Sequence, residues 1–348
     1  MKFFTTIFCF FLLMTAGRAQ PYVFYQNDKI IVQTLDSPSV HIDSFPLSEK
    51  EKHDVTIHFA KNPAWDFAVQ LKSIVANPPV SPARSMVLFL SDIEGEFELF
   101  RQLLIDNKII DIKYNWIFGR NQLVICGDLL DRGKYVTEEL WLLYKLETAA
   151  AVNGGEVHVL LGNHDIMNMG GDWRYVNPVY ATYAKMLNKS YGELFDDNTE
   201  LGKWLRSKNV IERIGNYLCM HGGFSREMLD MQLSVKELNS TIRPLYSLQD
   251  SLPQNMDVFF GDAALFWYRG YFFPPLAPES LIDSTLDFYK ARKIIVGHTI
   301  HNAVSTYYDG KVIGIDTDWH SGNAQGLLVD EKKFYKVGLD GAKEELGR

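Results

Sequence analysis

The stretch Leu123-Val-Ile-Cys-Gly-Asp-Leu-Leu-Asp-Arg-Gly133 decides the fold, because a solid apolar run ends there in a block of glycines, acids and an arginine. An uninterrupted apolar run of this kind is typical of a strand that is buried on both faces of a parallel sheet. Two acids, an arginine and bracketing glycines seldom coincide, so the block Gly127–Gly133 is a rather specific signal. It predicts a metal-binding or phosphate-binding turn at the carboxyl end of a strand.

Four further blocks follow apolar runs in the same way, and they are Asp92-Ile-Glu-Gly95, Gly162-Asn-His-Asp165, His221-Gly-Gly223 and Gly297-His-Thr299. Taken singly, the first two are most often turns or helix caps, and the last two are often core histidines at tight bends. All five blocks in this order, each after an apolar run, form a much stronger signal than any one of them.

The spacing of these runs predicts an α/β fold. Strands are expected at 86–90, 123–126 and 157–161, with helices over 97–104 and 137–151, and this alternation favours βαβ units with parallel pairing. Strands return at 217–220, 294–296, 312–315 and 327–329, so two groups of strands indicate a two-sheet sandwich with outer helices. Residues 170–215 and 225–290 are rich in aromatic residues and are predicted to be mostly helical inserts.

The N-terminal part divides into two predicted segments. Residues 1–19 have a basic start, a hydrophobic run and small residues at Gly17 and Ala19, which is typical of a secretory signal peptide. Residues 20–80 alternate apolar and polar positions and predict a small N-terminal β-element, which ends in a Pro-rich linker over 77–82. The catalytic domain is predicted to span 81–345.

Ligands of such sheets gather at the carboxyl ends of the strands, where every block lies. We therefore expect a centre of two divalent cations, because two such ions at roughly 3.5–4 Å can activate a water and hold a phosphate. Mixed oxygen and imidazole donors fit Mn²⁺, Fe or Zn²⁺ better than Ca²⁺. Asp128 is the predicted bridging ligand, and the full predicted set is Asp92, Glu94, Asp128, Asn163, His221 and His298.

The remaining polar residues of the blocks have predicted roles in catalysis. The planar guanidinium of Arg132 is suited to grip a phosphate oxygen. His164 is expected to act as the general acid, with Asp165 as the carboxylate that orients its imidazole. Asn163 is also a candidate contact for the substrate phosphate.

Taken together, the blocks resemble those of the metallophosphoesterase superfamily, also called calcineurin-like. Within it, the chain is similar to the phosphoprotein phosphatase branch, and particularly to the bacterial Shewanella-like phosphatases. The resemblance covers roughly residues 86–330 and includes Leu265-Phe-Trp-Tyr-Arg-Gly270 and Val296-Gly-His-Thr-Ile300. It implies a four-layer α/β/β/α sandwich, a dinuclear metal centre and hydrolysis of phosphomonoesters by a water that bridges the two ions.

The same resemblance implies that Arg269 is a second phosphate-binding arginine, with Arg174 as a weaker candidate for which a surface salt bridge is an equal alternative. Two residues depart from the pattern. Glu94 stands where most members have histidine, and a carboxylate there predicts a shift toward Mn²⁺, Mg²⁺ or Fe²⁺ and away from Zn²⁺, or else a weak or empty first site. Asp165 stands where the branch usually has glutamate.

Composition limits the partners. The chain of 348 residues has a net charge of −8 and no basic block, which gives no reason to expect nucleic acid as a partner. The apolar run near the N-terminus is shorter than the ~20 residues that span a bilayer, so we expect no stable membrane anchor and an exported protein, periplasmic or secreted. Cys126 and Cys219 end apolar runs and are predicted to be buried free thiols.

Three functions remain open at this level. The first is an exported phosphatase that acts on a phosphorylated small molecule or a phosphoprotein, with phosphoserine, phosphothreonine or phosphotyrosine as possible groups. The second is a dinucleoside polyphosphate or nucleotide phosphohydrolase. The third is a non-catalytic secreted binding protein on a phosphatase scaffold, against which the full set of predicted catalytic residues argues.

Overall fold

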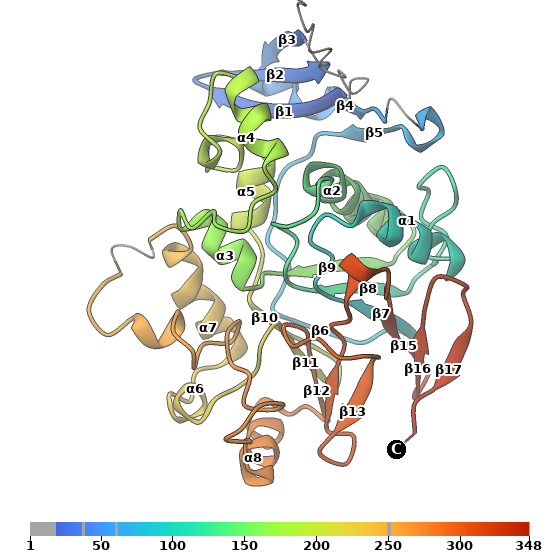
Figure 1. Cartoon of the computed structure of the whole chain (residues 1–348), viewed down its shortest axis with the longest axis vertical. Coiled ribbons are helices and arrows are strands. Elements are labelled where there is room, and N and C mark those ends of the chain that lie inside the picture. The colour runs from blue at the N-terminus through green and yellow to red at the C-terminus, as the bar shows by residue number, and fades with distance from the viewer. Residues whose placement is uncertain (1–18, 37–38, 60–61, 249–251, 348) are drawn as a thin grey trace, which may run out of the picture.

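The computed structural model describes residues 19–36, 39–59, 62–248 and 252–347. Within these ranges two six-stranded sheets face each other (Figure 1). The first has the order β17-β16-β15-β7-β8-β9, and its strands are β7 (Met86–Leu90), β8 (Gln122–Cys126), β9 (Glu156–Leu160), β15 (Gly326–Asp330), β16 (Lys333–Val337) and β17 (Lys343–Glu345). The strands β7, β8 and β9 are parallel, as predicted, whereas β15 pairs antiparallel with β7.

The second sheet has the order β13-β14-β12-β11-β10-β6. Its strands are β6 (Val80–Ser81), β10 (Ile211–Ile214), β11 (Tyr217–Met220), β12 (Lys293–Val296), β13 (Ser305–Tyr307) and β14 (Val312–Gly314). The parallel strands β11, β12 and β14 run beside one another, while β10 turns back antiparallel to β11. Four of the predicted strands therefore lie in the first sheet and three in the second.

An apolar layer joins the two sheets. Val87 and Val124 of the first sheet and Ile214 and Ile295 of the second belong to one buried cluster. The free thiols Cys126 and Cys219 are buried in the same layer, as predicted. Removal of apolar surface from water stabilises such a layer by roughly 25 cal/mol per Å².

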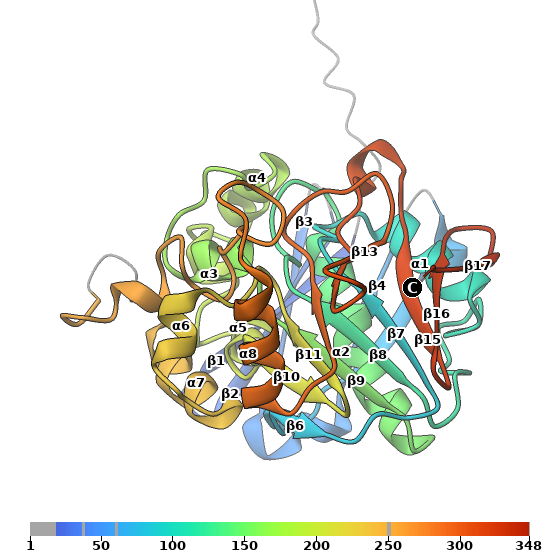
Figure 2. The same ribbon diagram turned by 90° about the horizontal axis from the view of Figure 1, so that it is seen from below.

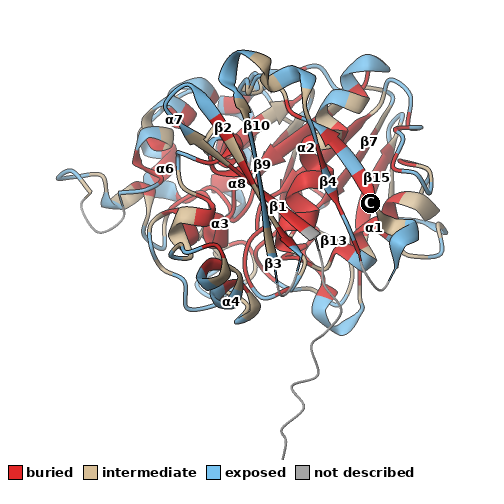
Figure 3. Ribbon diagram, turned by 90° about the horizontal axis from the view of Figure 1, so that it is seen from above, coloured by how far each residue is buried: buried red, intermediate tan, exposed pale blue. Residues whose placement is uncertain are grey.

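Helices cover both outer faces of the sandwich (Figure 2). On the first sheet lie α1 (Phe97–Asp106) and α2 (Val136–Val152), and on the side of the second sheet lie α6 (Arg226–Asp230), α7 (Val235–Ile242) and α8 (Glu279–Tyr289). Burial follows the layers, since the central strands and the inner helix faces are buried in Figure 3. The predicted four-layer α/β/β/α sandwich is confirmed.

The N-terminal residues form more strands than the sequence predicted. β1 (Ala19–Gln26), β2 (Lys29–Asp36) and β3 (Ser39–Pro46) make an antiparallel sheet, and β4 (Asp54–Ile57) pairs with β5 (Phe67–Gln70). This part packs on α2, where Trp141 Nε1 donates to the carbonyl of Pro21 at 3.1 Å. Residues 1–18 of the predicted signal peptide lie outside the described residues.

The segment 77–82 is not a free connection. It contains β6, which pairs in parallel with β10 and so belongs to the second sheet. Prolines at 78, 79 and 82 limit the strand to two residues, because proline offers no N–H to a ladder. The Pro-rich segment that predicted a linker therefore contains a short edge strand.

The predicted inserts are helical only in part. The first contains α4 (Val179–Met186) and α5 (Glu200–Arg206) after α3 (Asn163–Met169), but its residues 211–214 form a strand of the sheet. The second contains α6, α7 and α8, whereas the described residues between 246 and 278 are turns and irregular structure with one short 3₁₀ helix. No helix in the described ranges is both long and apolar enough to span a bilayer.

Candidate metal centre

The predicted metal ligands lie at the carboxyl ends of strands from both sheets. Asp92 and Glu94 follow β7, Asp128 follows β8, Asn163 begins α3 after β9, His221 follows β11, and His298 follows β12. Because the parallel strands of each sheet end at the same edge, the two edges bring these side chains to one place.

The contacts show that these residues converge. The Nε2 atom of His221 lies 3.0 Å from Asp128 Oδ2 and 3.0 Å from Asn163 Oδ1. The backbone N–H of His298 donates to Asp92 Oδ2 at 3.0 Å. The imidazole rings of His221 and His298 are 4.9 Å apart. Five residues spread over some two hundred positions therefore meet around one point.

The donor atoms fit two cations. Among the described residues, two groups of three have ligand atoms within 4.8 Å of one another, namely Asp128 with His221 and His298, and Glu94 with Asp128 and His164. Asp128 belongs to both groups, which is the arrangement that a bridging carboxylate requires. Carboxylate oxygens and imidazole nitrogens are ligands for Mn²⁺, Fe or Zn²⁺.

The backbone around the site is strained in a consistent way. Non-glycine residues with left-handed φ angles include Asp92 at 54°, Glu94 at 45°, Asp128 at 55° and His298 at 66°. Such conformations cost of order 1–3 kcal/mol each and gather at functional sites. Gly162 has no side chain for a related reason, because a Cβ atom there would collide with the carboxylate of Asp128.

His164, the predicted general acid, has a different carboxylate partner from the one predicted. His164 Nδ1 lies 2.6 Å from Asp131 Oδ2, and Asn168 Nδ2 donates to Asp131 Oδ1 at 2.7 Å. The backbone N–H of His164 donates to Asp128 Oδ1 at 2.9 Å, which ties the imidazole to the metal site. Asp131 therefore orients His164, and the assignment of this role to Asp165 was wrong.

Asp165 instead fixes the backbone beneath the site. Its carboxylate accepts hydrogen bonds from the N–H groups of Gly162 at 2.8 Å and of Asp128, Leu129 and Leu130 at 3.0 Å each. As the third residue of α3 it accepts the N–H of the N-cap residue Gly162, which is one half of a capping box. The prediction failed because a carboxylate at this position of a helix satisfies nearby N–H groups before it can reach the adjacent imidazole.

Both predicted phosphate-binding arginines lie at the site. Arg132 and Arg269 line a cavity together with His164 and His298. Arg132 forms an ion pair with Glu94, and Arg269 Nη1 donates to the carbonyl of His298 at 2.5 Å. Arg174 is exposed and paired with Asp172 through two nitrogens, so the salt-bridge alternative holds for it.

Neighbouring charges at the site shift one another's pKa values. Burial would raise the pKa of Asp128, but the imidazoles of His221 and His164 hold it below its usual range. Burial would lower the pKa of His221, yet Asp128 and Asp92 raise it to about 10. Burial and then the nearby carboxylates raise the pKa of Asp316, which lines the same cavity. Five acidic residues and two arginines line this cavity, and divalent cations would offset the repulsion among the carboxylates.

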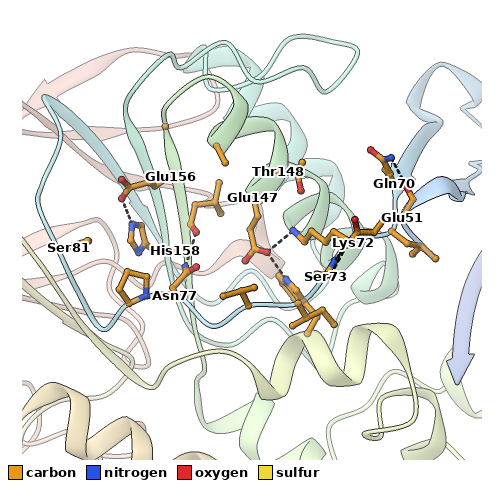
Figure 4. Close-up of a pocket in the computed structure, with 18 of the residues that line it drawn as sticks. Glu51, Gln70, Lys72, Ser73, Asn77, Ser81, Glu147, Thr148, Glu156 and His158 are labelled. Atoms are coloured by element: carbon orange, nitrogen blue, oxygen red, sulfur yellow. Dashed lines mark hydrogen bonds and ion pairs between the residues drawn. The ribbon is translucent and has the colours of Figure 1, made fainter. Parts of the chain in front are cut away.

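Two cavities can be compared as candidate substrate sites. The one at the metal centre has a volume of about 310 Å³ and contains the acids, histidines and arginines of the blocks. A second cavity, of about 840 Å³, lies between residues 70–82 and the end of α2 (Figure 4). Its charged groups pair with one another, as in Lys72 with Glu147 and His158 with Glu156. The second cavity thus offers no free cationic group for a phosphate.

Three residues of the site had no role in the sequence prediction. Asp131 stands in the Gly127–Gly133 block directly before Arg132. An acid next to an arginine in such a block is the signal that could have identified it. Asp316 directly follows the apolar run 312–315 and so carried the same signal as the blocks, although no role was assigned to it, whereas no apolar run precedes His320. His320 Nε2 lies 2.8 Å from Glu94 Oε2, a contact across 226 positions that only the fold reveals.

A two-sheet sandwich with these acids, imidazoles and arginines at its carboxyl edge defines a metal-dependent phosphoesterase. Residues 85–302 match the model of the calcineurin-like phosphoesterase family, and the chain belongs to that family. The predicted kinship with the metallophosphoesterases and with Shewanella-like phosphatases is confirmed.

Individual relatives agree with this assignment. The crystal structure of a cold-active protein-tyrosine phosphatase of a psychrophilic Shewanella species is 31% identical with a TM-score of 0.85, over 95% of this chain and 99% of that one. Shewanella-like protein phosphatase 1 of Plasmodium berghei is 27% identical over 73% of this chain and 74% of its own length. Shewanella-like protein phosphatase 2 of Arabidopsis thaliana is 24% identical over 68% and 72%.

Proposed function

We propose that this phosphatase is an exported enzyme that hydrolyses phosphomonoesters with two divalent cations, and that phosphotyrosine is its preferred group. The observation that carries the proposal is the pair of donor groups that share Asp128, one completed by His221 and His298 and the other by Glu94 and His164. Mn²⁺, Fe²⁺ or Mg²⁺ is the proposed metal, because Glu94 adds a hard carboxylate where most relatives have imidazole.

The residues of the site have separate roles in the proposed reaction. Asp128, Asn163, His221 and His298 would hold one cation, and Asp92, Glu94 and Asp128 the other. When bound, the two cations supply a water basic enough to attack phosphorus and offset the charge of the phosphate. Arg132 and Arg269 hold the non-bridging phosphate oxygens in line for the attack.

His164 completes the reaction by protonating the leaving oxygen. Its Nδ1 atom is held by Asp131 at 2.6 Å, which leaves Nε2 as the atom that transfers the proton. The two bonds that Asp131 makes, to His164 and to Asn168, keep the imidazole ring in one orientation.

The choice of phosphotyrosine rests on the surroundings of His164. The ring of Tyr175 lies 5.1 Å from the imidazole of His164 and is 45% exposed, so it stands beside the proposed general acid. Phe273 and Ile300 line the cavity at the metal centre and are also exposed. Exposed apolar side chains around a polar centre are typical of a binding surface for an apolar group. The solved Shewanella relative is described as a protein-tyrosine phosphatase.

The test is a panel of substrates measured with and without metal. We expect the purified chain to hydrolyse a phosphotyrosine peptide faster than the matched phosphoserine peptide, and both faster than diadenosine tetraphosphate. Chelation should abolish turnover and Mn²⁺ should restore it, while His164→Asn should remain inactive in either condition. Turnover of the His164→Asn variant equal to that of the wild type would refute the mechanism, and a preference for diadenosine tetraphosphate would refute the substrate class.

Export is tested separately. A full-length chain expressed in a Gram-negative host should lose its first residues and collect in the periplasm, as the basic start and apolar run predict. Retention of Met1 in cytoplasmic protein would contradict this part of the proposal.

A further inference from the structure

His320 occupies a position at the metal centre to which no role has been given. It belongs to the short 3₁₀ helix η7 (Trp319–Ser321) and lines the same cavity as Asp92 and Asp128. Its Nε2 atom lies 2.8 Å from Glu94 Oε2, and its Nδ1 atom lies 2.9 Å from Glu96 Oε1. The imidazole thus connects the last loop of the second sheet to the first block of the first sheet.

The carboxylate of Glu94 is buried, with 3% of the residue exposed. One oxygen accepts from His320, while the other, Oε1, faces the Arg132 guanidinium and lies 3.7 Å from His164 Nε2. Oε1 has no well-formed hydrogen bond of its own, although it is buried. One carboxylate oxygen of Glu94 lies within 4.8 Å of ligand atoms of Asp128 and His164, so this residue is placed to donate to a metal.

A glutamate needs a partner at this position more than a histidine would. Its side chain has three rotatable bonds and four lone-pair sites, and its Oε1 already contacts the guanidinium of Arg132, which could draw the carboxylate away from the cation. A donor on Oε2 opposes that rotation, because it fixes one end of the carboxylate and leaves Oε1 pointing at the shared centre. Outer donors of this type typically change metal affinity 10–100-fold.

We propose that His320 is a positioning residue that holds Glu94 for the first cation, in place of the imidazole that most relatives carry within the first block. Glu96 holds the other ring nitrogen and so keeps the imidazole in place. This proposal rests on the proposed metal centre, and it assigns to this chain a pair, Glu94 and His320, that works as one unit.

The test is a double-mutant cycle read by calorimetric titration of metal-free protein with Mn²⁺. His320→Asn should weaken the lower-affinity Mn²⁺ binding about 10–100-fold. In a Glu94→His background, the same His320→Asn change should alter affinity by less than about twofold, because the carboxylate that His320 holds is gone. His41→Asn, at a histidine with 66% of its side chain exposed on β3, is the matched control and should leave the titration unchanged.

The thermal midpoints of the metal-free variants separate positioning from folding. We expect His320→Asn to unfold within about 2 °C of the wild type, because one third of the His320 side chain is exposed and the buried Glu94 keeps its ion pair with Arg132 when the imidazole is removed. Equal Mn²⁺ affinity in the wild type and His320→Asn would overturn this inference alone, as would an equal loss in the Glu94→His background. A wild-type chain that binds no divalent cation would overturn the proposed function, and this inference with it.

Discussion

Replacement of Asp131 by asparagine tests whether Asp131 is the carboxylate that orients His164. His164 Nδ1 contacts Asp131 Oδ2 at 2.6 Å, and Asn168 Nδ2 already donates to Oδ1. An asparagine must therefore offer its oxygen to Asn168 and its NH₂ group to His164. The imidazole would then accept at Nδ1, so that nitrogen could not carry a proton. Proton transfer from Nε2 would have to leave an imidazolate, which makes such a ring a poor proton donor.

The expected loss follows from the hydrogen bond removed. A bond to a charged partner is worth about 1.5–3 kcal/mol, which corresponds to about 10–150-fold in rate if it acts only in the transition state. We expect kcat of Asp131→Asn to fall by that factor on an alkyl phosphate such as glycerol phosphate. The fall should be several-fold smaller on p-nitrophenyl phosphate, because p-nitrophenolate leaves without a proton.

Asp165→Asn is the control for this experiment, since its carboxylate accepts four backbone N–H groups. We expect it to lower the urea midpoint of unfolding while the ratio of kcat between the two substrates stays at the wild-type value. Steady-state kinetics at saturating Mn²⁺ measure both variants. The reasoning is refuted if Asp165→Asn changes that ratio and Asp131→Asn does not.

Three other perturbations have defined outcomes. Glu200→Gln removes a buried carboxylate that contacts a lysine and two tyrosine hydroxyls, and should cost about 3 kcal/mol in urea unfolding with kcat retained. Burial alone would lower the pKa of His158, but its hydrogen bonds to Glu156 and Glu212 raise this pKa from 6.5 to about 9. The contribution of His158 to the stability of the folded state is therefore complete below pH 6.5 and is lost as the pH rises through 9. The difference in thermal midpoint between wild type and His158→Gln should therefore shrink over that range, and a constant difference would contradict the assignment. Gly162→Ala should displace Asp128 and weaken Mn²⁺ binding at least tenfold in a calorimetric titration, whereas unchanged affinity would show that the loop yields freely.

The sequence predicted the parts of the fold that depend on local pattern. Continuous apolar runs such as Met86–Leu90 and Gln122–Cys126 became central strands, because strands buried on both faces need apolar residues on both sides. The blocks after them met at one edge because the direction of the strands dictates it. Short edge strands were harder, and β6 within 78–82 was hidden by its prolines.

The site was predictable where a residue stands in a block and less so where its role depends on a neighbour. Whether Asp131 or Asp165 holds His164 is decided by the start of α3, where one carboxylate caps the helix and the other is free to meet the ring. The contact between His320 and Glu94 joins loops from two sheets. Neither local propensity nor spacing carries information on such a pairing.

The left-handed conformations at Asp92, Asp128 and His298 bear on how this chain tolerates change. Glycine at any of these positions would relax the local geometry and make the folded state easier to reach, yet it would delete a donor atom. Selection for heat resistance alone would thus favour variants that are more stable but no longer hydrolyse substrate. The backbone positions with the least favourable φ angles are thus the ones that carry the predicted ligand atoms.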